Sequence, residues 1–137
     1  MKIVCDTNVL VSGVLFRGHP RRILVLAAQG RLTNFTSPAL LRQVEDVLSR
    51  PKFGLRPGQV ASILALFRDT FEVVHPNRSV TVIVDDPADN RVLEAAGAAS
   101  ANVIVSGDHH LLELKEWQGI RVMSPADFAA EVGSERP

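Results

Sequence analysis

Acidic residues follow short apolar runs at several points of the sequence. Asp6 and Asp85 come directly after such runs, and Asp108 follows the run 103–106 after one glycine. A short apolar run that ends in Asp is typical of a buried parallel strand, which delivers its carboxylate to the edge where open α/β sheets bind ligands. Carboxylates gathered at one edge repel each other unless protons or cations neutralise them. The pattern therefore predicts a site for a hard, oxygen-preferring cation such as Mg²⁺ or Mn²⁺.

Polar neighbours accompany the acids that follow the first and the clearest of these runs. Thr7 and Asn8 can hydrogen-bond Asp6 or the turn after it, and the hydroxyl of Ser106 can bond a carboxylate or a phosphate. Asp6 could instead form only an Asx-type turn, and Asp108 could serve only as a helix cap. Because the other acids converge with them, we expect both to have a metal-binding or catalytic role.

Helical periodicity selects two further acids. Glu45 lies just beside the apolar arc of the helix expected at 38–49, and Asp89 lies within the apolar face of the helix expected at 87–99. A carboxylate on a core-facing position is costly unless it is paired or bound to a metal. Glu45 could also be an ordinary boundary residue, and Asp89 could simply favour the helix dipole. We expect both to reach the sheet edge.

Other polar residues near these positions receive weaker assignments. Asp46 and Glu94 should point to solvent, and Asn90 should lie on a solvated face, with a lesser chance of orienting water or Asp89. Because the ligands of the expected cluster are otherwise all oxygen atoms, His109 and His110 are expected to contact substrate or to lie on the surface. Asp85 and Asp86 are given less weight than the other acids.

Strand-like and helix-like segments alternate along the chain, which predicts an α/β fold with a central, mainly parallel sheet flanked by helices. At 137 residues we expect one domain, 1–132, and a frayed tail at 133–137. Strands are expected at 2–5, 32–36, 72–75, 103–106 and 121–123, with 80–84 as a strand or an extended loop. Helices are expected at 20–29, 38–49, 58–71, 87–99, 109–116 and from 125 onward.

Composition restricts the partners of the chain. Aromatic residues make up 5% of the sequence, which argues against a binder that stacks many bases on aromatic rings. Fifteen basic and fifteen acidic residues leave no strongly basic nucleic-acid footprint, so nucleic-acid contact needs a local patch or a metal. Arg17, Arg21 and Arg22 could form such a patch or be a solvated helix start. A single Cys5 indicates a reduced, cytoplasmic setting, and no apolar run is long enough to span a membrane.

Taken together, Asp6-Thr7-Asn8, Glu45, Asp89 and Ser106-Gly107-Asp108 resemble the motifs of the PIN domain nucleases, in the right order over nearly the whole chain. The segments around Asp89 and Asp108 look most like the branch of toxins from bacterial toxin–antitoxin pairs. The resemblance implies an acidic quartet of Asp6, Glu45, Asp89 and Asp108 that binds Mg²⁺ or Mn²⁺, with Ser106 nearby. It also implies a single-strand-specific endoribonuclease, often dimeric, that a small antitoxin silences.

Carboxylate-held cations suit this chemistry independently of the family, because they can activate water and neutralise charge on phosphate oxygens. Two other families fit less well: a haloacid-dehalogenase phosphatase needs an acid at Asn8, and a phosphoryl-receiver domain needs one at Cys5. An RNA-processing nuclease without an antitoxin, or a non-catalytic PIN-like module that binds RNA or protein, remain alternatives. The apolar segments 9–16 and 58–71 belong either to the core or to a dimer or antitoxin surface.

Overall fold

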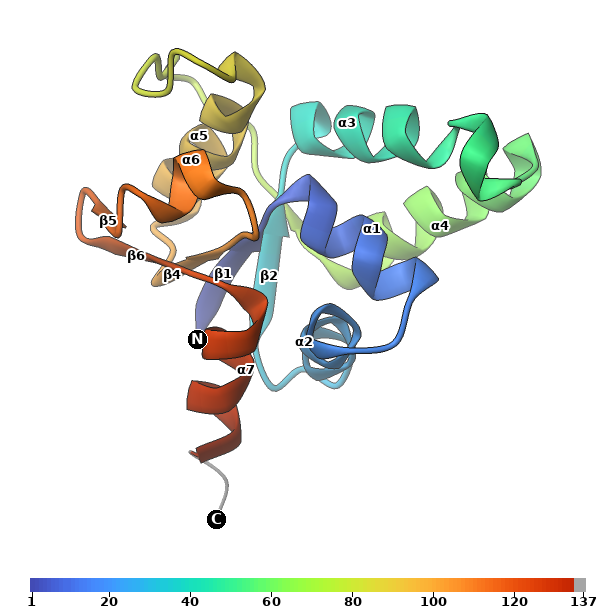
Figure 1. Cartoon of the computed structure of the whole chain (residues 1–137), viewed down its shortest axis with the longest axis horizontal. Helices are drawn as coiled ribbons and strands as arrows, with labels where there is room; N and C mark the ends of the chain where they lie inside the picture. Colours follow the sequence, from blue (N-terminus) through green and yellow to red (C-terminus); the bar gives the residue numbers. More distant parts are fainter. Residues whose placement is uncertain (135–137) are drawn as a thin grey trace.

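In the computed structural model, which describes residues 1–134, a six-stranded sheet carries helices on both faces (Figure 1). The strand order is β3-β2-β1-β4-β6-β5, and only the β5–β6 pair is antiparallel among the pairs described. The predicted α/β fold with a mainly parallel sheet is confirmed. The strands are β1 (Lys2–Cys5), β2 (Thr33–Thr36), β3 (Glu72–Val73), β4 (Val103–Val105), β5 (Glu116–Trp117) and β6 (Ile120–Met123).

The first strand of the chain lies in the middle of the sheet. β1 pairs with β2 on one side, and on the other it pairs with β4, where Cys5 lies opposite Val105. The chain therefore builds one half of the sheet, returns past β1 and builds the other half. Such a reversal of strand order opens a crevice at the carboxyl ends of the two strands concerned. Asp6 and Ser106, the residues that follow β1 and β4, both lie at this edge of the sheet, which we call the crevice.

Two apolar cores cover the two faces of the sheet. One contains Ile3 and Cys5 together with residues of α1, α2, α4 and α7, and the other contains Val4 and Ile104 together with residues of α5 and α6. Alternating residues of β1 thus face opposite cores, as strand geometry requires. The helices are α1 (Thr7–Leu15), α2 (His19–Ala28), α3 (Pro38–Leu48), α4 (Pro57–Thr70), α5 (Asn90–Ala99), α6 (His109–Leu112) and α7 (Pro125–Ser134), with 3₁₀ turns η1 (Pro51–Phe53) and η2 (Pro87–Asp89).

Helix α3 begins where the sequence predicts it. The Ser37 hydroxyl accepts the backbone N–H of Leu40 at 3.2 Å, and Pro38 occupies the first turn, where its missing N–H costs nothing. Leu40, Leu41 and Val44 are buried along the apolar side of the helix. This burial fixes the rotation of α3 about its own axis.

The segment 80–84 forms no strand, so the extended-loop alternative is correct and a buried strand is not. Ile83 is buried, but Val84 is 80% exposed. The backbone N–H and carbonyl of Ile83 bond the side chain of Asn90 at 2.9 and 2.8 Å, instead of a neighbouring strand. An amide side chain therefore satisfies the backbone that a sheet ladder would otherwise pair.

Two boundaries near the C-terminus also differ from expectation. Helix α6 ends at Leu112 rather than near residue 116, because Lys115 has a left-handed backbone with a φ of +59° and β5 already begins at Glu116. Helix α7 continues to Ser134, so the predicted tail does not begin at 133, and residues 135–137 lie outside the described part. No helix within residues 1–134 is both long and apolar enough to cross a membrane.

Candidate active site at the carboxyl ends of β1 and β4

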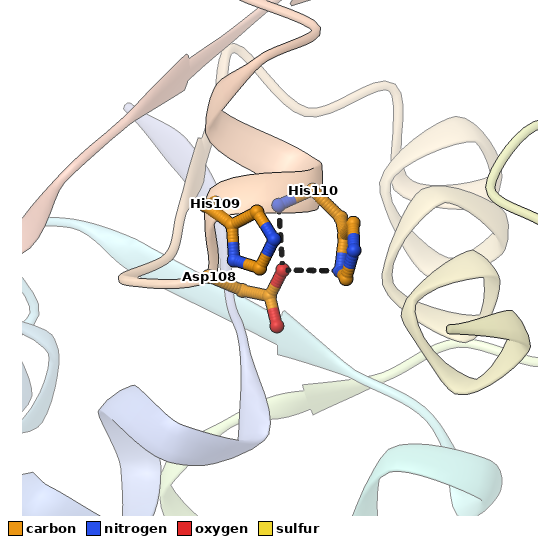
Figure 2. Close-up of side chains that lie close together, drawn as sticks. All are labelled: Asp108, His109 and His110. Carbon is orange, nitrogen blue, oxygen red and sulfur yellow. Dashed lines mark hydrogen bonds and ion pairs between the residues drawn. The ribbon is translucent and has the colours of Figure 1, made fainter. Parts of the chain in front are cut away.

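The segment after β4 places Asp108 at the start of the short helix α6. The backbone N–H of Asp108 donates to the Ser106 hydroxyl at 2.9 Å, and Asp108 Oδ1 accepts the backbone N–H of His110 at 2.8 Å. The ring nitrogen Nδ1 of His110 lies 3.3 Å from the same oxygen (Figure 2). Asp108 therefore caps α6, as the simpler interpretation predicts, and also presents its carboxylate to the crevice.

Ser106 links Asp108 to the acid at the end of β1. Its hydroxyl donates to Asp6 Oδ2 at 2.6 Å, and the backbone N–H of Asp6 bonds the carbonyl of Val105 at 2.9 Å. Asp6 is 4% exposed. Burial raises the pKa of the Asp6 carboxyl, the hydrogen bond from Ser106 opposes that effect, and the charge of Asp108 adds to it. The predicted partnership of Asp6, Ser106 and Asp108 is present in the structure.

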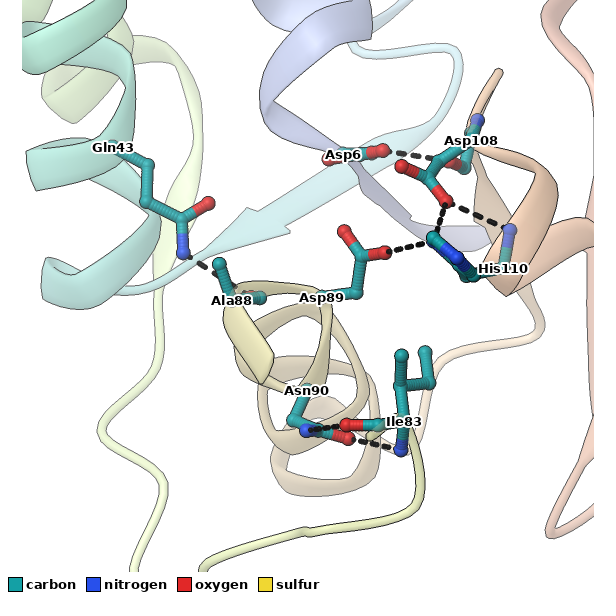
Figure 3. A network of polar contacts seen from close by, with 9 residues as sticks. Asp6, Gln43, Ile83, Ala88, Asp89, Asn90, Asp108 and His110 are labelled. Carbon is teal, nitrogen blue, oxygen red and sulfur yellow. Dashed lines mark hydrogen bonds and ion pairs between the residues drawn. The ribbon is translucent and has the colours of Figure 1, made fainter. Parts of the chain in front are cut away.

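Asp89 approaches the same point from the opposite side of the crevice, at the junction of η2 and α5 (Figure 3). Its side chain is 9% exposed, and its Oδ2 is buried without a hydrogen-bond partner, 3.8 Å from His110 Nδ1. Burial, reinforced by the negative charges of Asp108, Asp6 and Asp86, raises the pKa of Asp89 to about 7. The core-facing acid predicted from helical periodicity is thus buried beside other acids, as expected.

Two residues that sequence reasoning left outside the cluster lie in it. Asp86, Asp89, Asp108 and His110 each offer one ligand atom, and these atoms all lie within 4.8 Å of one another. Asp86, which the sequence weighs below the other acids, lies at the N-cap position of η2, but its side chain makes no capping hydrogen bond. His109, next to His110, is exposed. The group therefore contains a nitrogen donor as well as carboxylate oxygens, contrary to the expectation of an all-oxygen cluster.

The expected fourth acid, Glu45, is not brought to this group. It is exposed and lines a separate pocket of about 290 Å³ that α3 shares with Leu64 and His75. The residue of α3 that faces the crevice is Gln43, whose Oε1 accepts the Thr7 hydroxyl at 2.8 Å and whose Nε2 donates to the Ala88 carbonyl at 3.2 Å (Figure 3). A neutral amide thus bridges the segments that carry Asp6 and Asp89.

Helical geometry explains why the sequence selects Glu45. At 3.6 residues per turn, Gln43 and Glu45 flank the apolar arc of α3 on its two sides, each about 40° from the arc's nearest member. The arc shows which side of α3 is buried but not which flank faces the crevice. The packed orientation of α3 turns the flank that carries Gln43, and not the flank that carries Glu45, toward the acids.

The arginines predicted to contact substrate lie away from the acids. Arg21 donates to the carbonyls of Gly13 and Val14 at 3.1 and 2.7 Å, and so caps the C-terminal end of α1. Asp6 precedes the other end of that nine-residue helix, which is roughly 13 Å long. Arg17 and Arg22 are exposed, and they lie near the C-terminal end of α1 that Arg21 caps. The arginine cluster is therefore not part of the crevice, whereas Asn8 is exposed on the first turn of α1, beside Asp6.

Two polar residues of α5 also differ from their expected positions. Asn90 is 2% exposed and holds Ile83 rather than lying on a solvated face. The Glu94 side chain is 11% exposed, pairs with Arg91 at 2.9 Å and accepts the backbone N–H of Val80, so it does not point freely to solvent. Asp46, in contrast, is exposed as predicted.

The family model of the PIN domain matches residues 2–110 of this chain. The chain belongs to the PIN domain family. It is 30% identical to the uncharacterized protein MJ1680 of Methanocaldococcus jannaschii over 143 aligned positions, which cover 96% of this chain and 91% of that protein. The predicted resemblance to the family is thereby confirmed, and the crevice between β1 and β4 is the crevice of a PIN domain.

Solved structures support the same fold. The PIN domain superposes on a chain of VapBC2 from Rickettsia felis, solved bound to a DNA fragment from its promoter, with a TM-score of 0.64 and 16% identity over 90% of this chain and 98% of that one. It superposes on PAE2754 from Pyrobaculum aerophilum with a TM-score of 0.65 and 14% identity over 98% of this chain and 91% of that one. At these identities the likeness concerns the fold.

Proposed function

We propose that this PIN domain is a metal-dependent endoribonuclease that hydrolyses phosphodiester bonds in single-stranded RNA. The convergence of Asp6, Asp89 and Asp108 at the carboxyl ends of β1 and β4 carries the proposal. These acids come from segments that are far apart in sequence, and the pKa values of two of them are raised. Burying like charges together is unfavourable for folding alone, which is why such groups mark functional sites.

The donor atoms at the crevice fit a divalent cation. Carboxylate oxygens are the preferred ligands of Mg²⁺ and Mn²⁺, and Asp89 Oδ2 is a buried acceptor without a hydrogen-bond partner. Asp89, Asp108 and Asp86 would hold the ion, with Asp6 as a further direct or water-mediated ligand. When bound, the ion would activate a water molecule and neutralise charge that develops on the phosphate oxygens.

The protein's own groups would orient these ligands and the substrate. Ser106 holds Asp6 by a hydrogen bond of 2.6 Å, so this carboxylate keeps one orientation. Gln43 ties the turn that carries Asp89 to the start of α1. The exposed Asn8 side chain stands at the rim, where it would contact an RNA phosphate or ribose.

A single-stranded substrate is favoured by the charge of the chain. Its formal net charge is zero, and Arg21 of the predicted basic patch is engaged in capping α1. No broad basic surface is therefore expected to hold the backbone of a long duplex. A flexible strand needs only to bring one phosphate to the carboxylates, and it can bend into the crevice more easily than a double helix.

The fold also favours a toxin of a toxin–antitoxin pair. VapBC2 from Rickettsia felis was solved with a DNA fragment from its promoter, and one of its chains shares this fold. We propose a cytoplasmic toxin whose partner is a small antitoxin. A short reading frame directly upstream of the gene, and co-purification of its product, would support the pair. Absence of both would favour an RNA-processing nuclease without an antitoxin.

One observation favours a non-catalytic RNA- or protein-binding module as the second candidate. Helix α3 presents the neutral Gln43 to the crevice, while Glu45 lies on the other flank of the apolar arc. A site with fewer acids holds a cation less strongly. Measured hydrolysis therefore decides between the two candidates.

The test is cleavage of a fluorescently labelled single-stranded RNA, compared with the same strand fully paired, in Mg²⁺ or Mn²⁺. We expect the unpaired strand to be cut faster and excess chelator to stop the reaction. Asp6→Asn and Asp89→Asn should each lower the rate by roughly 100-fold or more, since even outer-shell partners of metal ligands are worth 10- to 100-fold.

Asp46→Asn is the matched control, because Asp46 is an exposed acid of α3. It should retain the wild-type rate. Full activity of Asp89→Asn, or activity that survives the chelator, would refute the metal mechanism. Equal rates on paired and unpaired RNA would refute the substrate assignment alone.

A further inference from the structure

His110 reaches the acids from helix α6, and its side chain is 25% exposed. Its Nδ1 is buried, lies 3.3 Å from Asp108 Oδ1 and 3.8 Å from Asp89 Oδ2, and makes a hydrogen bond to neither (Figures 2 and 3). A buried ring nitrogen without a hydrogen-bond partner is costly, because burial removes water and no hydrogen bond replaces it. The ring is therefore held in place by something other than hydrogen bonding at Nδ1.

The nearest oxygen of Asp89 has the same deficit. Asp89 Oδ2 is buried without a hydrogen-bond partner, on a side chain that is 9% exposed. Two unsatisfied atoms, one a carboxylate oxygen and the other a ring nitrogen, thus face each other across 3.8 Å. That separation is too long for a hydrogen bond between them.

A shared cation accounts for both deficits. Two ligand atoms that each lie about 2.1 Å from one ion are about 3.0 Å apart at a right angle and about 4.2 Å apart on opposite sides. Both distances from His110 Nδ1, 3.3 Å to Asp108 Oδ1 and 3.8 Å to Asp89 Oδ2, fall inside this range. The His110 nitrogen can therefore share one ion with either carboxylate oxygen with little rearrangement of the side chains.

We propose that His110 is a nitrogen ligand of the ion at this site, so that the site prefers Mn²⁺, a transition-metal ion, over Mg²⁺. The inference rests on the proposed function and specifies its cofactor. Imidazole suits transition metals, whereas Mg²⁺ is held by oxygen ligands and retained waters. As a ligand through Nδ1, the ring carries its proton on Nε2.

The substitution His110→Asn tests the assignment directly, because it places an amide oxygen near the position of Nδ1. Mn²⁺ and Mg²⁺ affinities of the full chain are measured by calorimetry for the wild type, His110→Asn and His110→Ala. We expect Mn²⁺ to bind the wild type more tightly than Mg²⁺. Both variants should lose roughly ten-fold or more in Mn²⁺ affinity, while His110→Asn keeps its Mg²⁺ affinity within a few-fold.

Pulsed electron paramagnetic resonance of the Mn²⁺-loaded chain provides a readout independent of affinity and of catalysis. A coordinated imidazole gives nitrogen modulation, which should appear in the wild type and disappear in His110→Asn. His75→Gln is the matched control, because His75 is exposed and lies in the pocket shared by α3 and Leu64, outside the acidic group. His109→Gln tests the neighbouring histidine and should keep the modulation.

Each outcome separates this inference from the proposed function. Nitrogen modulation that is absent from the wild type, or that survives His110→Asn, would overturn the assignment even if the chain cleaves RNA. Loss of modulation in His109→Gln would show that His109 provides the nitrogen ligand, and would also overturn the assignment of His110. Modulation that depends on His110 in a chain that cleaves no RNA would support the ligand and refute the nuclease.

Discussion

Asp89 is a buried carboxyl group whose protonation should control the stability of the metal-free protein. Its pKa of about 7 in the folded state exceeds the value of about 3.9 expected in the unfolded chain. Between these two values the folded state binds more protons, so the free energy of unfolding falls as pH rises from about 4 to about 7.

The first prediction is that Asp89→Asn removes most of this pH dependence. In excess chelator at pH 8 the variant should be more stable than the wild type by roughly 1–3 kcal/mol, and near pH 4 the two should be alike. Urea denaturation across this pH range measures the difference. Asp46→Asn, at an exposed acid, should follow the wild type, and a wild-type profile that is flat from pH 4 to 8 would contradict the prediction.

The second prediction concerns the two flanks of α3. Gln43→Glu removes the N–H that bonds the Ala88 carbonyl and adds a charge near Asp6 and Asp89. Metal-free protein should lose roughly 1–3 kcal/mol of stability at pH 8, and saturating Mn²⁺ should restore more of it than in the wild type. Thermal denaturation with and without Mn²⁺ is the measurement.

Glu45→Gln is the reciprocal control. Because Glu45 is exposed in a different pocket, this variant should keep the wild-type melting temperature and the wild-type response to Mn²⁺. If Glu45→Gln weakens Mn²⁺ binding while Gln43→Glu leaves it unchanged, the orientation assigned to α3 is wrong.

The contrast between Asp89 and Glu45 shows what single residues reveal before folding. Asp6, Asp89 and Asp108 could be selected because each follows a strand or lies on a buried helix face. An acid is unusual at such positions, because removing a carboxylate from water is costly. The positions of Gln43, Asp86 and His110 depend on how α3, η2 and α6 are oriented in three dimensions. No local pattern in the sequence specifies these orientations.

Among the elements, the loop before η2 depends on a single side chain. Asn90 makes two hydrogen bonds to the backbone of Ile83 and thereby holds the segment that leads to Asp86 and Asp89. The third prediction is that Asn90→Ala destabilises the protein by about 1–3 kcal/mol, because it leaves the buried N–H and carbonyl of Ile83 unpaired.

Limited proteolysis should show the same effect locally. Cleavage near the exposed Val82 and Val84 should become faster in Asn90→Ala before the rest of the chain is digested. Asn77→Ala, an exposed asparagine at the other end of this loop, is the control and should cut at the wild-type rate. Unchanged stability and unchanged cleavage in Asn90→Ala would show that the clamp is dispensable.

The same loop marks where element prediction from sequence fails. Segments with a strong pattern, such as 2–5 and the helix opened by Ser37 and Pro38, form as predicted because local propensity and burial agree. The segment 80–84 has the composition of a strand, but its backbone finds its partner in Asn90 rather than in a sheet. The strand expected at 121–123 forms as β6, but its antiparallel partner β5 is not predicted, because β5 is only two residues long and Gly119 is the main local signal of the turn.

On the scale of the whole molecule, one apolar groove lies between helices on the face opposite α5. It has a volume of about 340 Å³, is lined by residues of α1, α2 and α4, and includes Val25 and Leu66, which are 46% and 59% exposed. Most of the large apolar side chains in the segments 9–16 and 58–71 are core, whereas Leu66 is left uncovered in this groove and Phe16 is exposed outside it. Exposed apolar grooves of this kind commonly bind a partner or a second copy.

The fourth prediction is that the protein self-associates through this groove. Leu66→Glu should shift the mass in solution from dimer to monomer while the chain stays folded, because the Leu66 side chain is largely exposed in the single chain. Light scattering after size exclusion measures the mass. Ala61→Glu, on an exposed part of α4 outside the groove, should stay dimeric, and a wild type that is monomeric at all concentrations would contradict the prediction.

The central position of β1 has a consequence for synthesis of the protein on the ribosome. The hydrogen bond between Ser106 and Asp6 joins residues 100 positions apart, and β1 is not enclosed on both sides until β4 has been made. In a chain that is still being synthesised, Asp6 therefore leaves the ribosome long before Asp89 and Asp108 can pack beside it. Under the proposed function, the chain cannot cut the messenger RNA that encodes it until the segment that carries Ser106 and Asp108 has left the exit tunnel and reached β1.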